Sequence, residues 1–171
     1  MCCSWKAYRV QRFTYLIQAS KLLDDKFKIF ISGTGELTES LKKEAANDSK
    51  ITFTGRIEDE DLKAYILACD IFCFPSITKN EAFGVALAEA MYYGKPAVTF
   101  HISGSGVNYV CLDKVSGLEV ENRNVSKYAE ALLYLAENKS VRQEYGKNGK
   151  QRVLDNFLDK QFKNNIRKVN L

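Results

Sequence analysis

The sequence contains one histidine, His101, among its 171 residues. Most catalytic zinc sites and all Ser-His-Asp triads need histidine side chains, as metal ligands or as the base beside a nucleophile. We therefore expect neither a zinc site nor a histidine-based triad, and no metal or other cofactor is predicted.

Cysteines are few and are not arranged as a disulfide or metal motif. Their number is odd, and no C-x-x-C pair occurs. Free thiols that pack as small hydrophobic groups in a reducing cytoplasm are the simplest interpretation. The five positions are Cys2, Cys3, Cys69, Cys73 and Cys111.

Long apolar runs are missing as well. The longest nearly apolar stretch, residues 64–75, is interrupted by Asp70 and is shorter than the roughly 20 residues of a membrane helix. Residues 1–6 lack the basic start, long apolar stretch and cleavage site of a secretion signal. We expect a cytoplasmic protein.

The chain is otherwise typical of a soluble domain, with 46% hydrophobic and 27% charged residues. Its net charge of +4 is uneven, because residues 139–171 carry nine Lys/Arg against three Asp/Glu. Such a basic tail can meet phosphate-bearing ligands or the anionic inner face of a cell membrane, or it can be a solvated helix face. Few aromatics lie between these charges, so we expect no nucleic-acid partner.

Helical and strand patterns alternate along the chain. The order predicts a single α/β domain, residues 1–171, with a Rossmann-like doubly wound parallel sheet. The opening strand has only residues 2–5 available, and residues 157–171 are expected to form a C-terminal helix or tail. Ser126 is the expected cap of one late helix, and Ser140 with Gln143 forms a capping box for the next. Helices are expected over 13–23, 36–46, 58–69, 83–93, 126–136 and from 140, and strands over 27–32, 51–54, 71–74, 97–100 and 118–120.

In doubly wound sheets, ligands bind beyond the carboxyl ends of the strands. The unusual segments of this sequence fall at those ends. They are Gly33–Gly35, Gly55-Arg56, Ser76–Gly84 and Ser103–Gly106.

The turn Gly33-Thr34-Gly35 stands between a strand and a helix, which is the context of a dinucleotide-binding motif. Thr38 replaces the third glycine, and Glu36 would face the pyrophosphate. We therefore do not expect classical NAD binding. Close approach of another ligand and a plain turn both stay open.

Two glutamates, Glu81 and Glu89, are separated by seven residues in an otherwise almost wholly apolar segment. A buried carboxylate must be compensated by a charge, by amides or by ligand hydroxyls. The helix start at Gly84 could bind phosphate with Lys79 nearby, and Glu89 could accept from ribose hydroxyls. Alternatively Glu89 pairs with Arg56 or another basic residue, and Glu81 only complements the helix dipole.

The segment PSITKNEAFGVALAEAMYYGKPAV closely resembles the E-x7-E signature of retaining glycosyltransferases of the GT-B fold, family 4. The similarity extends in order through YLIQASKLLDDKFKIFISGTGELTESLK, ITFTGRIEDEDLKAYILACDIFCFPS and GSGVNYV to YAEALLYLAEN, over roughly residues 10–160. These segments look like the C-terminal, donor-binding domain of that family. The sequences of these segments are most similar to those of bacterial mannosyl- and rhamnosyltransferases of polysaccharide assembly.

The resemblance implies a role for each matched residue. Glu81 would contact the donor sugar near the reacting centre, and Glu89 would bind the nucleotide ribose. The nucleobase would meet the backbone at Arg56 and Ile57. The amides of Phe83, Gly84 and Val85 would hold the diphosphate and sugar, and the turn Gly33, Thr34 and Gly35 would border the cleft.

Two positions depart from the family pattern. The arginine and lysine that usually grip the phosphates fall on Lys6 and Gln11, so one charge is kept without its bidentate fork and the other is lost. Arg9 or Arg12 could substitute. The glycine that usually follows the first glutamate is Ala82.

The resemblance implies transfer of a hexosyl group from a nucleotide diphosphate sugar, with retention, to a glycan or lipid-linked acceptor. It also implies an N-terminal acceptor domain that this chain does not contain, so we expect donor binding and negligible transfer by the chain alone. The alternatives are a non-catalytic nucleotide-sugar-binding or regulatory module and a sugar epimerase of the same fold.

Overall fold

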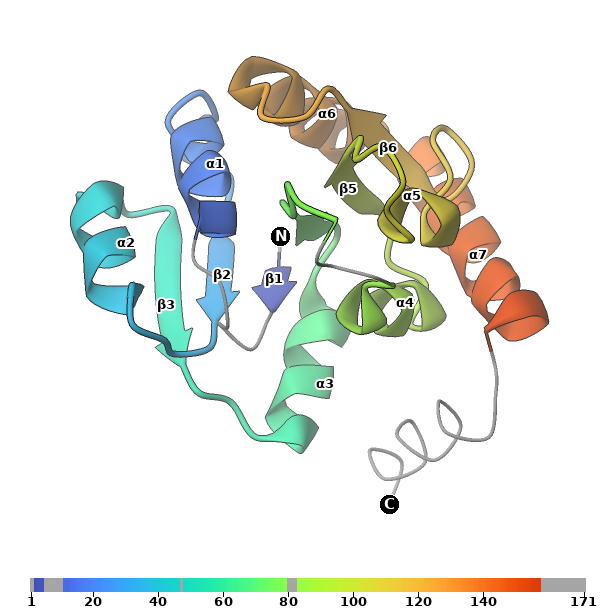
Figure 1. Ribbon diagram of the computed structural model, residues 1–171, viewed down its shortest axis with the longest axis horizontal. Coiled ribbons are helices and arrows are strands. Elements are labelled where there is room, and N and C mark those ends of the chain that lie inside the picture. Colours follow the sequence, from blue (N-terminus) through green and yellow to red (C-terminus); the bar gives the residue numbers. More distant parts are fainter. Residues whose placement is uncertain (1, 5–10, 47, 80–82, 158–171) are drawn as a thin grey trace.

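The computed structural model describes residues 2–4, 11–46, 48–79 and 83–157. These residues form one parallel sheet with the strand order β3-β2-β1-β4-β5-β6 (Figure 1). The order runs outward in both directions from β1, as the predicted doubly wound fold requires. The strands are β1 (Cys2–Ser4), β2 (Ile29–Ser32), β3 (Ile51–Gly55), β4 (Phe72–Phe74), β5 (Ala97–Phe100) and β6 (Gly117–Val120).

The opening strand is short, as predicted, and it lies at the centre of the sheet. Cys3 is in register with Ile31 of β2, and Cys2 is in register with Phe72 of β4. Residues at the very start of the chain therefore join the two halves of the sheet.

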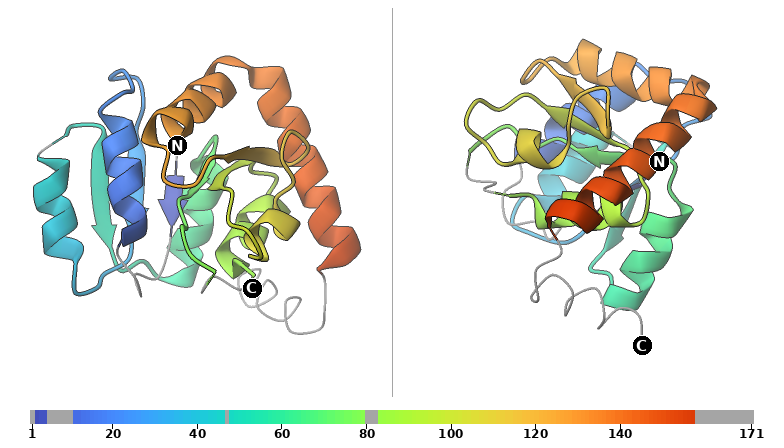
Figure 2. Two further views of the ribbon diagram at one scale, coloured as in Figure 1. Left: turned by 45° about the horizontal axis from the view of Figure 1, so that its top comes forward. Right: turned by 90° about the vertical axis from the view of Figure 1, so that its right-hand side faces the viewer.

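Two layers of helices cover the sheet (Figures 1 and 2). One hydrophobic core unites α1, α2 and α6 with one face, and a second unites α3, α4 and α5 with the other. The long α7 passes the β6 edge, with Tyr145 packed on the first core and Val153 in the second. The helices are α1 (Gln11–Ser20), α2 (Thr38–Ala45), α3 (Asp59–Ala68), α4 (Val85–Tyr92), α5 (Val107–Val110), α6 (Val125–Glu137) and α7 (Lys139–Asn156).

Alternation along the central strands explains why the apolar runs are continuous. In β4, Phe72 and Phe74 point to the α4 layer, whereas Cys73 points to the α1 layer. All three side chains are buried, as expected for a strand covered on both faces. Cys69, Cys73 and Cys111 are buried free thiols, which confirms for these three that they pack as small hydrophobic groups.

Helices α4 and α7 approach one another through two glycines. A Cβ on Gly146 of α7 would lie 2.1 Å from the carbonyl oxygen of Gly94, which follows α4. No side chain fits at Gly146. Because glycine has none, α7 packs directly on the end of α4.

Two capping predictions were wrong. The side chain of Asn124, and not Ser126, caps α6, by accepting a hydrogen bond of 3.0 Å from the Lys127 amide. Helix α7 begins at Lys139 with no side-chain cap, so Ser140 already lies inside it. The sequence patterns also missed α5, a single turn of four residues that follows the glycine-rich loop. Residues 158–171 of the expected C-terminal tail lie outside the described residues.

Candidate functional site

All strand pairs are parallel, so the carboxyl ends of the strands meet at one edge of the sheet. The predicted site segments that the structure describes all lie along this edge, because each follows a strand directly. Gly33 follows β2, Gly55 ends β3, and Ser76 lies two residues after β4. Glu81 and Lys6 belong to the predicted site but lie outside the described residues.

The Gly33–Gly35 turn is tied to its neighbours by backbone hydrogen bonds. The Gly33 amide donates to the Gly55 carbonyl at 2.7 Å, and Gly33 has φ +110°. The Gly35 amide donates to Oγ1 of Thr38 at 2.8 Å. Both glycine amides are thus used within the protein, and the exposed Thr34 is the part of the turn that faces solvent.

Arg56 and Ile57 leave β3 at the outer end of the same edge. Gly55 before them has φ +72°, and a Cβ there would meet no atom within 4 Å. Arg56 is exposed and Ile57 is half-buried. The space beside the Gly55 backbone is therefore open.

The start of α4 is fixed from two sides. Gly84, the N-cap, has φ +75° and lies against the ring of Phe74. Phe83 is half-buried, and its ring meets that of Phe157 edge-on with 5.2 Å between centroids. The first amides of a helix have no partner inside it, so the N-terminus of α4 offers hydrogen-bond donors and a positive dipole end at this edge.

Lys79 reaches across to the next loop. A Cβ on Gly104 would lie 3.4 Å from Nζ of Lys79, so the lysine head lies beside the β5–α5 loop. The structure thereby joins Lys79 to the Ser103–Gly106 segment, which the sequence patterns treated separately. The exposed ammonium group places a positive charge between the ends of β4 and β5.

Glu89 lies one turn inside α4, among buried neighbours. Its side chain is half-buried, so the expectation of a carboxylate with little access to water holds only in part. Burial, and then the charge of Glu89, raise the pKa of Tyr93 above its ordinary value. The carboxylate therefore lies close enough to Tyr93 to act on it electrostatically.

A side-chain network at the ends of β5 and β6 was not predicted. His101 donates through Nδ1 to Glu119, and Asn108 of α5 donates to the other oxygen of the same carboxylate. The signal in the sequence was a glutamate between the apolar Leu118 and Val120 of a strand. A strand residue in that position points to the opposite face from its neighbours.

No three His, Cys, Asp or Glu side chains come together as a metal site within residues 2–4, 11–46, 48–79 and 83–157. Over the same residues, every helix is too short or too polar to cross a bilayer.

The sequence and the structure were compared with known proteins. Residues 4–152 match the family described as glycosyl transferases group 1. The chain is 30% identical over 154 residues to the O-antigen chain mannosyltransferase C of Escherichia coli, covering 86% of this chain and 41% of that protein. It is 32% identical over 133 residues to the D-rhamnosyltransferase WbpZ of Pseudomonas aeruginosa, covering 77% and 35%.

Among solved structures, the fold is similar to Anabaena Alr3699/HepE in complex with UDP-glucose, with a TM-score of 0.80 and 18% identity. That likeness covers 98% of this chain and 48% of the other. The chain thus spans less than half the length of these three proteins. The extent of the family match and the shared fold show that this chain belongs to the glycosyl transferases group 1, with the fold of the C-terminal half of a GT-B glycosyltransferase.

Proposed function

We propose that this chain is the donor-binding half of a retaining glycosyltransferase. It binds a nucleotide diphosphate sugar along the carboxyl edge of the sheet, and the whole enzyme transfers the hexosyl group to a glycan or lipid-linked acceptor. The names of the relatives point to a mannosyl or rhamnosyl donor. The acceptor domain that completes the enzyme is an N-terminal domain outside this sequence.

The start of α4 is the observation that carries the proposal. A helix N-terminus at a sheet edge binds the phosphates of nucleotides, because its amides and its dipole both favour anions. Gly84 allows the diphosphate to approach the backbone closely, and Glu89 lies one turn further along the same helix. A carboxylate there accepts hydrogen bonds from the two vicinal hydroxyls of ribose.

The other predicted residues fit an extended ligand. The backbone at Arg56 and Ile57 meets the base, and Thr34 borders the cleft within the Gly33–Gly35 turn. Glu81 contacts the sugar near the reacting carbon, and Phe83 and Val85 flank Gly84 with their amides. Lys6, which lies outside the described residues, would meet the phosphates.

Charge builds up on the leaving diphosphate as the bond to the sugar breaks. The dipole of α4 and the ammonium group of Lys79 stabilise that charge in the proposed mechanism, so the reaction needs no metal ion. As the acceptor oxygen bonds to the sugar, an oxygen of the departing diphosphate takes the proton of the acceptor hydroxyl. Retention follows because the acceptor attacks from the face that the diphosphate leaves.

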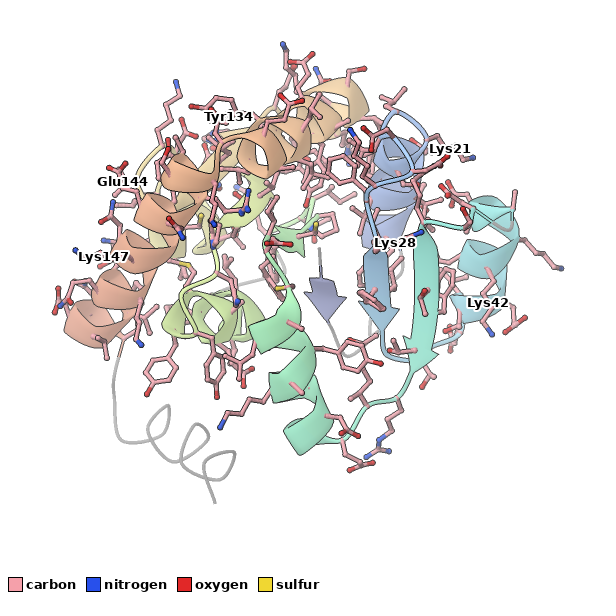
Figure 3. All side chains as sticks on the ribbon, turned by 180° about the vertical axis from the view of Figure 1, so that it is seen from behind. Lys21, Lys28, Lys42, Tyr134, Glu144 and Lys147 are labelled. Carbon is pink, nitrogen blue, oxygen red and sulfur yellow. The ribbon has the colours of Figure 1, made fainter. Side chains whose placement is uncertain are left out.

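Calorimetric titration of the chain with UDP, GDP and dTDP tests the proposal. We expect one of these nucleotides to bind preferentially, and Glu89→Ala to weaken that binding about tenfold, as loss of a charged acceptor for two hydroxyls predicts. Glu144→Ala is the matched control. It removes an exposed carboxylate from α7, on the outer side of the molecule (Figure 3), and should leave the affinity unchanged.

Equal affinity of the Glu89→Ala variant and the original chain would contradict the ribose assignment. Failure of the folded chain to bind any nucleotide would contradict donor binding by this half alone. Two rival functions are separated by a second assay with an N-terminal domain supplied. A regulatory module binds nucleotide without transfer, and an epimerase interconverts the sugar without an acceptor.

A further inference from the structure

His101 belongs to a side-chain hydrogen-bond network at the end of β5. Its Nδ1 bonds to one oxygen of Glu119, and Nδ2 of Asn108 bonds to the other. Asn108 Nδ2 also donates to the Phe100 carbonyl at 3.1 Å, and Asn108 Oδ1 accepts from the Ile102 amide at 2.8 Å. Asn108 thus fixes the Glu119 carboxylate, and that carboxylate holds the imidazole ring through Nδ1.

The network has one open position. A carboxylate only accepts, so Nδ1 of His101 carries a hydrogen, and Nε2 is an acceptor in the tautomer that has its single hydrogen on Nδ1. Within the part of the chain that the structure describes, Nε2 has no protein partner. The side chain of Glu119 is 18% exposed and that of His101 is 60% exposed, so the half-buried carboxylate holds a ring that is open to solvent.

The ring lies on the same face of the sheet as the start of α4. Phe100 points to the other layer, where its ring contacts Tyr15 and Tyr128. Successive side chains of a strand alternate, so His101 faces the layer of α4 and α5. The Lys79 head lies beside Gly104 of the loop that follows His101.

Along the sheet edge, His101 lies where the sugar of the donor, which follows the diphosphate, would extend. Neighbouring strands are about 4.8 Å apart, so β5 lies four steps, about 19 Å, from β3. A donor with its base at Arg56 after β3 and its phosphates at Gly84 after β4 directs its sugar toward β5. A sugar presents hydroxyl groups, so a hydrogen-bond acceptor at this position could bind it, whereas an apolar side chain could not.

We propose that Nε2 of His101 accepts a hydrogen bond from a sugar hydroxyl, which makes His101 a specificity-determining residue, with Glu119 and Asn108 as positioning residues. The proposal rests on the proposed function of the carboxyl edge. The hydroxyl belongs either to the sugar of the donor or to the acceptor glycan. A sugar that lacks this hydroxyl would leave the acceptor unpaired and bind less tightly.

His101 is the only histidine, so its ring signals in an NMR spectrum need no assignment by mutation. The chain is titrated with the nucleotide diphosphate it binds, then with the matching nucleotide sugar (GDP-mannose or UDP-glucose), and then with the nucleotide plus methyl α-mannoside. A shift of the ring signals only with the nucleotide sugar assigns the hydroxyl to the donor. A shift only when the mannoside is added assigns it to the acceptor.

Two variants separate hydrogen bonding from structure. His101→Phe keeps a ring but removes the acceptor, and we expect it to weaken binding of the assigned sugar ligand about tenfold, with affinity for the nucleotide diphosphate unchanged. His101→Gln keeps a polar acceptor and should recover part of the loss. Glu119→Gln should give an intermediate loss, because the ring is then less firmly oriented.

Unchanged ring signals in all three titrations, while the nucleotide binds, would overturn the His101 assignment and leave the proposed function standing. Equal loss of nucleotide and sugar affinity in His101→Phe would also overturn it. Failure of every nucleotide and nucleotide sugar to bind would overturn the proposed function, and this assignment with it.

Discussion

The backbone of Gly84 lies directly against the ring of Phe74. A Cβ at Gly84 would stand 3.3 Å from Cζ of that ring, tighter than an ordinary contact, and φ is +75°. Both the conformation and the space therefore favour glycine. Through this contact the last residue of β4 fixes where α4, and the amides at its start, begin.

Gly84→Ala should be destabilising for both reasons. We expect a loss of about 2 kcal/mol in the free energy of unfolding, measured with urea, from left-handed strain and from displacement of the ring. Gly94→Ala is the matched control, since Gly94 has φ +74° but its nearest contact is 3.9 Å away. It should cost about 1 kcal/mol. Equal losses, or an unchanged nucleotide affinity for Gly84→Ala, would contradict this role of the Phe74 contact.

The contact between α4 and α7 predicts a large effect at Gly146. Because a Cβ there would meet the Gly94 carbonyl oxygen at 2.1 Å, Gly146→Ala should cost about 3 kcal/mol or more. Gly149→Ala, one turn away, would meet the flexible Met91 side chain at 3.4 Å and Cβ of Ser116 at 3.5 Å, and should change stability by about 1 kcal/mol or less. Thermal and urea unfolding of the pair measures the difference. Similar stabilities would show that the helices separate easily.

Asp48 predicts a pH dependence of stability. Burial opposes its ionisation, but the hydrogen bonds from Lys50 and from the Ser20 hydroxyl outweigh burial and hold the pKa of the carboxyl below its ordinary value. A lowered folded-state pKa stabilises the protein above the unfolded-state value of about 3.9, and this contribution is lost as the pH falls through the folded-state pKa.

Asp48→Asn should therefore cost about 2 kcal/mol at pH 7, and the difference from the original chain should shrink below about pH 4. Asp25→Asn is the control, because that carboxylate is 93% exposed although it lies 3.9 Å from the same lysine. It should change stability by less than about 1 kcal/mol. Urea unfolding from pH 7 to below about pH 4 measures the free energy of unfolding of both variants and the original chain. A loss in Asp48→Asn that does not change with pH would contradict the link between Asp48 ionisation and stability.

Cys111 should be chemically inert in the folded protein. Burial raises the pKa of its thiol to about 12, and only the thiolate reacts with alkylating agents. We expect no alkylation of Cys111 at pH 8 until the protein unfolds, as followed by peptide mass spectrometry. A cysteine placed at Val115, which is 44% exposed in the same loop, is the positive control and should react at once. Rapid labelling of Cys111 would mean that the loop opens readily.

Much of the fold could be predicted from local patterns. The strands 71–74 and 97–100 are short apolar runs, and helical patterns alternate with strand patterns along the chain. This alternation implies a doubly wound sheet. Cap residues were harder. Ser126 has a good capping side chain, but α6 begins at Val125, so Ser126 lies inside the helix and Asn124 is the cap.

The residues of the candidate site could be chosen from the sequence, but their contacts could not. Glu89, Gly84 and Arg56 could be chosen because their residue types and spacing match a family signature. Their contacts could not be derived, because the side-chain packing that decides them joins segments far apart in the chain. The half-burial of Glu89, the reach of Lys79 to Gly104 and the ring of Phe157 against Phe83 are examples.

The sequence by itself determined the alternation of strands and helices, the single histidine and the glutamate pair, since these depend only on residue type and local spacing. Only the tertiary structure decided that Cys2–Ser4 would be the central strand. It also decided that His101 and Asn108 would both bond to the carboxylate of Glu119. Such contacts form when parallel strands bring their carboxyl ends to one edge, and no local pattern records which side chains then meet.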